Sequence, residues 1–435
     1  MPSSFWNSCI AATVFLITGS GMVYSDDWPQ WRGLHRDGVW HENGIIESFD
    51  TEQLKHRWKA PVSSGYSGPT VAQGRVYVMD RIVQPNQQER VHCFDAETGR
   101  RLWTHAYNCE YRNISYEAGP RSSVSIESGK AYSLGSMGHL VCMDAVNGSV
   151  LWNRDLNSDF QIRMPTWGIA GSPVVEDDLV IVQIGGAQNA CVVAFDKTTG
   201  EERWRNVSDD TSYASPMVIT QAGKRVLVCW TGQNVIGIDP KTGTVFWSQP
   251  FPPHLWIIGI ATPVVHNDRL FLTSCNDGSL MLQLDPSQPS ATKLWQRKGE
   301  NERKTDALHS LISTPYLEGN YIYGVDAYAE LRCLDARTGD RVWEDLSALP
   351  RLRYGTIHMI RNGKNIWMFT DRGELIICRL SPSGYQELSR AKLIEPTTQM
   401  RFRPQEPVCW SHPAFSNRHV FARNDKELVC VSLEK

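Results

Sequence analysis

Histidine and hydroxyl side chains are the residues of this chain that could most directly do chemistry. Four widely spaced histidines could converge on a metal ion: His254, His309, His358 and His412. None of their spacings resembles a zinc motif, so we expect scattered polar contacts from them. Four hydroxyl residues are candidate nucleophiles: Ser172, Ser215, Thr262 and Thr314. No His–Asp partner stands at a spacing that would activate them, and their regular recurrence favours structural roles.

Cysteine is the other reactive residue type, with 11 copies in the chain. Five of them recur at one position of a sequence repeat: Cys93, Cys142, Cys333, Cys378 and Cys430. Equivalent positions in neighbouring units of a repeat fold lie too far apart for a disulfide, so we expect free thiols in buried sites. Cys109 and Cys409 form the one loop pair that merits a test for a disulfide.

The elements that position these residues must form a large folded body. The chain has 435 residues, of which 41% are hydrophobic and 10% aromatic, enough to bury an extensive core. Its formal net charge is −3, and no long run of one charge sign occurs. These values argue against nucleic acid or an anionic membrane surface as the main partner.

A repeated motif organises most of the chain. It reads small-x-Asp-x-x-x-Gly followed by Trp four residues later, and Asp95, Gly99 and Trp103 form one complete copy. Tryptophan ends five further copies: Trp152, Trp204, Trp247, Trp295 and Trp343. From Trp58 to Leu388 successive endpoints are 43 to 52 residues apart, which is the length of a four-stranded propeller blade. The Asp and Gly suit a tight hairpin turn, and the Trp offers a flat surface to the next blade.

A second register gives the number of units. Each unit opens with three small or turn residues that enter a strand, as in Gly171-Ser-Pro and Ala214-Ser-Pro, and eight such openings occur between Ser67 and Pro413. Proline is tolerated where a strand begins or lies on an edge, as the innermost strand of a blade does. The sequence therefore predicts an all-β fold, an eight-bladed β-propeller of four-stranded antiparallel blades.

The N- and C-terminal strands are expected to close this ring. Seven complete units lie between Trp58 and Leu388, and residues 411–433 begin an eighth unit that lacks its last strand. An isolated strand at Trp58 supplies that strand, which removes an exposed sheet edge. Deletion of residues 50–60 should then destabilise the last blade.

The N-terminus has the pattern of an export signal. An apolar stretch runs from Cys9 to Ile17, and Val23-Tyr24-Ser25 is a small-residue cleavage site. We therefore expect a signal peptide at 1–25, an N-terminal extension at 26–57 and the propeller at 58–435, exported to the periplasm or the outside of the cell. No Lys or Arg precedes the apolar stretch, which leaves an uncleaved anchor as the alternative. No membrane span is expected once the signal is removed.

The repeat identifies a family by resemblance. The Asp-x-x-Thr-Gly-x-x-x-Trp units, Trp28-Pro-Gln-Trp-Arg-Gly, Met164-Pro-Thr-Trp-Gly and Tyr213-Ala-Ser-Pro resemble exported bacterial propellers of the pyrroloquinoline-quinone (PQQ) repeat type. Those propellers are related to quinoprotein alcohol dehydrogenases and to the propeller lipoprotein that assists outer-membrane protein assembly. The resemblance is specific for the fold and weak for function.

The dehydrogenase branch of this resemblance implies a quinone pocket, a Ca²⁺ site and a catalytic aspartate. The sequence contains neither a Cys-Cys pair nor a Cys-x-x-Cys-His motif, and the calcium ligands and catalytic Asp of those enzymes fall on no matching positions. The aspartates of the repeat are explained by their turns. PQQ with Ca²⁺ is therefore the cofactor of an alternative hypothesis only.

One residue of each unit is expected at the mouth of the central channel. It stands two residues before the middle of each opening triplet: Tyr66, Arg121, Ala170, Tyr213, Ile260, Ile312, Tyr354 and Trp410. The aromatic members could stack on a flat group while Arg121 holds an anion. In the alternative interpretation these residues pack between blades and a carboxylate neutralises Arg121.

Long connections between blades should border the same mouth. They span residues 104–121, 153–170 and 389–410, and they carry aromatic and basic residues: Tyr107, Tyr111, Tyr116, Arg163, Trp167, Arg401 and Arg403. Loops on a rigid scaffold are frequent binding sites. Trp167 and Arg163 therefore join the candidate ligand-binding set, which contains no catalytic and no metal-binding residue.

The leading functional hypothesis is an exported, non-catalytic binding or scaffolding propeller. Its partner at the mouth would be a small molecule or a protein of the cell envelope. The first alternative is a PQQ-dependent alcohol or sugar dehydrogenase with a divergent site. The second is an assembly factor for outer-membrane proteins, although no lipid-attachment cysteine follows the apolar stretch.

Overall fold

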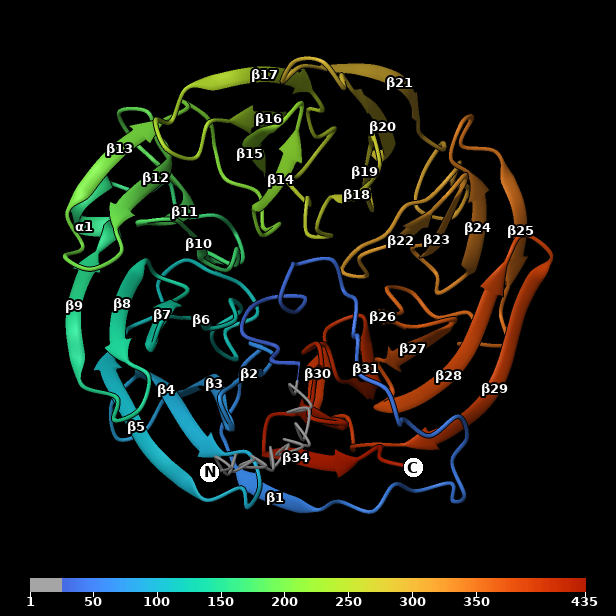
Figure 1. Ribbon diagram of the computed structural model, residues 1–435, viewed down its shortest axis with the longest axis horizontal. Helices are drawn as coiled ribbons and strands as arrows, with labels where there is room; N and C mark the ends of the chain where they lie inside the picture. Colours follow the sequence, from blue (N-terminus) through green and yellow to red (C-terminus); the bar gives the residue numbers. More distant parts are fainter. Residues whose placement is uncertain (1–25) are drawn as a thin grey trace, which may run out of the picture.

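The computed structural model describes residues 26–435. Eight four-stranded antiparallel sheets stand around a central channel, each with its first strand innermost (Figure 1). This arrangement confirms the predicted all-β, eight-bladed propeller. The expected signal peptide at 1–25 lies outside the described residues.

The blades are numbered 1 to 8 by the chain order of their innermost strands. Blades 1 to 4 comprise, in order, β2 (Thr70–Ala72), β3 (Arg75–Ile82), β4 (Gln88–Asp95), β5 (Arg101–Asn108); β6 (Ser125–Glu127), β7 (Lys130–Leu134), β8 (His139–Asp144), β9 (Val150–Asp155); β10 (Val174–Glu176), β11 (Leu179–Gly186), β12 (Ala190–Asp196), β13 (Glu202–Asn206); and β14 (Met217–Gln221), β15 (Lys224–Trp230), β16 (Asn234–Ile238), β17 (Val245–Pro250).

Blades 5 to 8 comprise β18 (Val264–His266), β19 (Arg269–Ser274), β20 (Gly278–Leu284), β21 (Ala291–Arg297); β22 (Tyr316–Glu318), β23 (Tyr321–Val325), β24 (Leu331–Asp335), β25 (Arg341–Asp345); β26 (Ile357–Asn362), β27 (Asn365–Thr370), β28 (Glu374–Ser381), β29 (Gly384–Lys392); and β32 (Ala414–Ser416), β33 (His419–Arg423), β34 (Glu427–Ser432), β1 (Trp58–Pro61). Outside the blades lie a hairpin of β30 (Thr398–Met400) and β31 (Arg403–Val408) and the short helix α1 (Leu156–Phe160). Within residues 26–435 no helix is long and apolar enough to cross a membrane.

Strands from both ends of the chain share blade 8, as predicted. β1 pairs antiparallel with β34, with Trp58 opposite Cys430 and Pro61 opposite Glu427. Arg423 of β33 is completely buried and donates to the carbonyls of Met79 (2.9 Å) and Ser63. Backbone pairing therefore closes blade 8, and a buried guanidinium joins it to blade 1.

Motif tryptophans hydrogen-bond to the next blade at six of the eight blade junctions. The indole Nε1 of Trp58 donates to the carbonyl of Ala96 (2.9 Å), and that of Trp103 to Ala145 (3.2 Å). Trp152, Trp204, Trp295 and Trp343 make the same bond to the residue at the corresponding turn of the next blade. The turn of blade 5 contains two extra residues. Trp247 of blade 4, which precedes it, donates instead to the side chain of Gln221 in its own blade (3.2 Å).

The turn that receives each tryptophan explains the rest of the motif. In blade 1, Oδ1 of Asp95 accepts from the backbone and hydroxyl of Thr98 (2.9 and 2.8 Å). Gly99 has φ +71°, and a Cβ there would come within 2.6 Å of the Trp58 ring. Glycine is therefore needed both for the left-handed turn and for the close approach of the indole.

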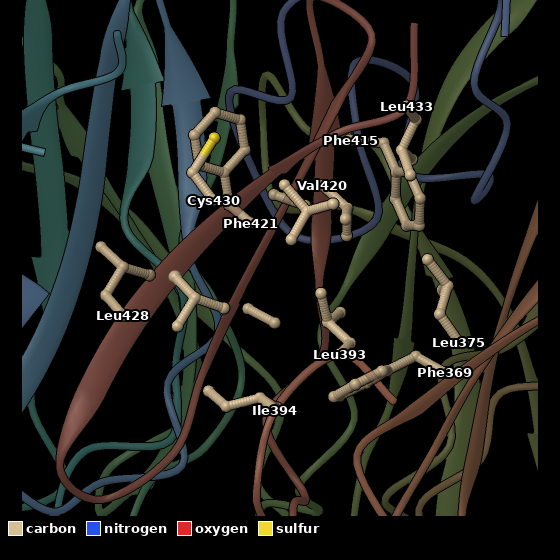
Figure 2. Packing of buried hydrophobic residues seen from close by; sticks show 14 of the residues in the cluster. Phe369, Leu375, Leu393, Ile394, Phe415, Val420, Phe421, Leu428, Cys430 and Leu433 are labelled. Carbon is tan, nitrogen blue, oxygen red and sulfur yellow. The ribbon is translucent and has the colours of Figure 1, made fainter. Parts of the chain in front are cut away.

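The hydrophobic core is divided into layers between adjacent blades. The largest layer joins blades 7, 8 and 1, and Figure 2 shows Phe369 and Leu375 of blade 7 in the same cluster as Phe415 and Val420 of blade 8. The ten cysteines of the described residues are free and buried. The Cys109 thiol contacts His139 and the Cys409 thiol contacts the Arg423 carbonyl, so the structure pairs these two cysteines with other groups.

The N-terminal extension enters the channel. Trp28 pairs with Val71 at the inner edge of blade 1, and the indole of Trp31 donates to Thr262 in blade 5 (2.8 Å). Arg36 is buried and donates to the carbonyls of Pro216 (3.1 Å) and Pro173. The blue segment in Figure 1 correspondingly crosses the centre of the ring before it runs along blade 7 to β1.

Replacing Trp58 with Ala should destabilise the whole ring, because it removes a buried side chain and the Ala96 bond at the closure. We expect a loss of about 3–5 kcal/mol, measured as a lower midpoint in thermal or urea unfolding. Deletion of residues 50–60 should cost more. Trp256, which is 58% exposed, provides the control, and W256A should melt like the parent. Equal melting of W58A and W256A would contradict this account of ring closure.

Candidate functional site

All eight channel-mouth positions expected from the sequence line one cavity of about 250 Å³. The periodic spacing therefore located one lining residue in each blade. The other lining residues come from the connections between blades, from the opening triplets and the strands that follow them, and from the N-terminal extension. They are Trp31, Tyr116, Trp167, Ser172, Ser215, Ile258, Leu311, His358, Phe402 and His412. The cavity is a pocket at one end of the channel.

Aromatic side chains form much of the cavity wall. Trp410 lies between Tyr66 and Tyr116, with ring centroids 6.2 and 5.8 Å away. Trp167 and Tyr213 form a second pair at 5.0 Å. Burial raises the pKa of Tyr66, and raises that of Tyr213 to about 12, so both phenols stay protonated near neutral pH. These faces are uncharged and suited to stacking.

Arg121 is the one permanently charged residue in the cavity lining. Its guanidinium lies 5.3 Å from the Tyr66 ring centre and donates to the carbonyls of Gly119 (2.7 Å), Ser115 (2.9 Å) and Tyr116 (2.6 Å). The alternative expectation of a neutralising carboxylate is wrong in detail, because backbone carbonyls hold this side chain. Ser136 Oγ is a fourth acceptor (3.1 Å), so the terminal N–H groups are bonded within the chain, while the positive charge has no ion-pair partner among the described residues.

Trp31 and two histidines form the floor of the cavity. The Trp31 ring meets His412 edge-on at 4.4 Å, and the His412 and His358 rings are 6.2 Å apart. His412 Nε2 bonds to Ser123 Oγ (2.7 Å), and His358 Nε2 bonds to the Trp410 carbonyl (3.0 Å). Burial lowers the pKa of His358 to about 4 and that of His412 to about 3. Both imidazoles are therefore neutral at physiological pH.

The recurrent serines and threonines link neighbouring blades. Ser172 Oγ accepts from the Ser123 amide (2.9 Å), and Ser215 Oγ accepts from the Ser172 amide (3.0 Å). Thr314 Oγ1 accepts from the Thr262 amide in the same way (3.1 Å). These bonds give the hydroxyls the structural role expected from their spacing, and the hydroxyls of Ser172 and Ser215 also face the cavity.

Some loop residues lie away from the cavity. Arg163 is 63% exposed and pairs with Asp210 (2.9 Å), so the structure separates it from the other candidate residues. Tyr107 and Tyr111 hydrogen-bond to buried Glu89 (2.6 and 2.5 Å). His309 bonds to the Cys275 carbonyl and the Gly299 amide, away from the two floor histidines.

Four lining residues were not found by sequence reasoning: the aliphatic Ile258 and Leu311 and the aromatic Trp31 and Phe402. Trp31 belongs to the Trp28-Pro-Gln-Trp segment, which stands outside every repeat and so has no periodic position. Phe402 lies in the turn between β30 and β31, a hairpin present in one connection only. An unpaired aromatic residue in a non-repeating segment was the only signal for Trp31 or Phe402.

The lining residues do not fit PQQ with its calcium ion. That cofactor is a fused-ring quinone with several carboxylates, whereas the cavity offers a single guanidinium and two neutral imidazoles. A Ca²⁺ ion needs oxygen ligands that include carboxylates, and the lining contains none. Residues 26–435 contain no group of three or more His, Cys, Asp or Glu placed to hold a metal ion.

The fold and the repeat define a PQQ-type β-propeller. The chain matches the family described as outer membrane protein assembly factor BamB over residues 39–106, 87–345 and 232–435, and it belongs to that family. This match confirms the resemblance seen in the repeat motifs.

Named relatives fall into two groups. The quinohemoprotein alcohol dehydrogenase of Comamonas testosteroni is 28% identical over 54% of this chain and 33% of its own length. BamB of Alteromonas naphthalenivorans is 28% identical over 49% of this chain and 52% of its own length. BamB of Yersinia pestis is 21% identical over 78% of this chain and 79% of its own length. The chain thus spans a third to about half of the length of the first relatives that it matches.

Solved structures agree on the fold. The crystal structure of the Comamonas dehydrogenase superposes with a TM-score of 0.65 at 13% identity, covering 94% of this chain and 81% of that one. BamB from Moraxella catarrhalis superposes with a TM-score of 0.56 at 15% identity, covering 87% and 97%. At such low identity these similarities establish the propeller architecture alone.

The floor histidines predict a stability that falls in mild acid. Their pKa values in the fold, about 4 and about 3, lie below the ordinary 6.5, so between pH 6.5 and 4 the unfolded chain binds protons that the fold does not. The free energy of unfolding should drop by about 1.4 kcal/mol per pH unit for each histidine. Urea unfolding at pH 7.5 and 5.0 should show a smaller drop for H358Q/H412Q than for the parent. An equal drop in both proteins would refute this.

Proposed function

We propose that this chain is an exported, non-catalytic binding propeller whose mouth cavity takes one flat aromatic group from a partner protein or a small ligand. The observation that supports it is the cavity itself, lined by aromatic rings, one oriented guanidinium and no carboxylate. Its volume of about 250 Å³ is below the roughly 300–1,000 Å³ of pockets for drug-sized ligands. An indole or phenol ring suits that space better than a larger cofactor.

The family description favours an envelope protein as the source of this aromatic group. Relatives from four bacteria are named as outer membrane protein assembly factors. A partner side chain inserted into a rigid pocket is an anchor of the kind that dominates protein interfaces. We therefore place the proposed role in the cell envelope, as a scaffold that holds another protein at the channel mouth.

Loss of the aromatic wall should abolish partner capture. In a pull-down from envelope extract, Y66A/W410A should retain at least about tenfold less of any specifically bound protein, because both rings of one stacked wall are removed. Y321A is the matched control, because Tyr321 starts β23 at the end of blade 6 that lies away from the channel mouth. Equal recovery by both variants would count against the mouth cavity as the site.

A second candidate function, oxidation with bound PQQ, is favoured by the similarity to the Comamonas dehydrogenase and opposed by the chemistry of the lining. Titrating the purified protein with PQQ and Ca²⁺ should give no saturable spectral change, and alcohols or sugars should not reduce an artificial electron acceptor. A quinoprotein dehydrogenase in the same assay is the positive control. Saturable binding with turnover would replace the binding role by an enzymatic one.

A further inference from the structure

A second and larger hollow adjoins the mouth cavity. It has a volume of about 740 Å³ and is lined by the β30–β31 hairpin and by loops around blade 6, which contribute Arg303, Tyr328 and residues 351–353. Phe402 lines both hollows and is 50% exposed. The basic groove, as we name this hollow, is therefore adjacent to the cavity, and the exposed ring of Phe402 borders both.

Arginines are held over aromatic rings along the basic groove. The guanidinium of Arg353 lies 4.6 Å from the Tyr354 ring and 4.7 Å from the Phe402 ring, and that of Arg401 lies 5.9 Å from Phe402. Arg303 and Arg351 lie 6.0 and 5.8 Å from the ring of Tyr328. Stacking orients these long side chains, so less freedom is lost when they bind an anion.

The charges of the basic groove are only partly compensated. Arg353 pairs with Glu302 (2.9 Å), Arg351 with Glu330 (3.2 Å) and Arg403 with Asp371 (2.7 Å). Arg303, which lines the basic groove, and Arg401, which lies beside Phe402 at the edge of the groove, are exposed and have no ion-pair partner among the described residues. Two guanidinium groups on a chain of net charge −3 are thus available to an external anion.

We propose that the basic groove binds a short acidic peptide segment of the same partner whose aromatic side chain enters the mouth cavity. Carboxylates would meet Arg303 and Arg401, and an apolar residue would cover Phe402. This inference rests on the proposed function, because it extends that site along the same face.

The built-in carboxylates select this partner over a polyanion. Glu302, Glu330 and Glu406 pair with Arg353, Arg351 and Arg403, so the net positive charge of the groove is small. Binding of nucleic acid needs many uncompensated cations at once, whereas one or two side-chain carboxylates need only the two free arginines.

Isothermal titration calorimetry of the full-length mature protein tests the inference with a capped peptide in which acidic residues flank one tryptophan on both sides. The parent should bind it at least about tenfold more tightly than the peptide with Gln and Asn in place of the acids, and R303Q/R401Q should lose about the same factor. R100Q is the control variant. It replaces an exposed arginine in the turn between β4 and β5 of blade 1, and it should bind the acidic peptide like the parent.

Three outcomes would overturn the inference. They are equal affinity for the acidic and the amide peptide, unchanged affinity in R303Q/R401Q, and tighter binding of a single-stranded oligonucleotide than of the acidic peptide. Y66A/W410A separates this inference from the proposed function. If that variant loses both peptides while R303Q/R401Q keeps both, the cavity binds as proposed and the basic groove does not.

Discussion

The contact of a tryptophan with the turn of the next blade is the interaction on which this structure depends. In this contact the indole needs a carbonyl at a fixed height and a glycine backbone beneath its ring, which Ala96 and Gly99 provide for Trp58. Because the carbonyl bond recurs at six of the eight junctions, it fixes the angle between those blades and helps to bring the eight inner strands around one axis. The cavity at the channel mouth exists because these contacts hold its eight entrance residues at equal steps.

That dependence explains which parts of the site the sequence could predict. The entrance residues inherit their places from the repeat, so counting from Trp58 and from the opening triplets was enough to bring Tyr66 and Trp410 to one cavity. Trp31 reaches the same cavity through a hydrogen bond to Thr262, 231 residues away, and no periodicity connects the two. Arg163 stands on a loop of the right kind, but a local ion pair with Asp210 holds it elsewhere.

The named relatives of this chain include alcohol dehydrogenases and outer membrane protein assembly factors. In this chain the channel is filled from within. Trp31 and the neutral His412 close one end, and Arg36 donates to backbone carbonyls deeper inside. What stays open is a shallow, mostly apolar pocket beside a row of stacked arginines.

The way the N-terminal segment is built into the ring also has a consequence for how the protein is made. Residues 28–61 leave the ribosome early, yet their partners lie in blades 4, 5, 7 and 8 and as far along the chain as Lys435. Native pairing of such distant segments is slow, and until it occurs the unpaired strand edge is exposed and prone to aggregation. A chain that stops before β34 leaves β1 without its neighbour. The architecture thus makes completeness of synthesis a condition of folding, so prematurely ended chains remain recognisable to proteases and chaperones.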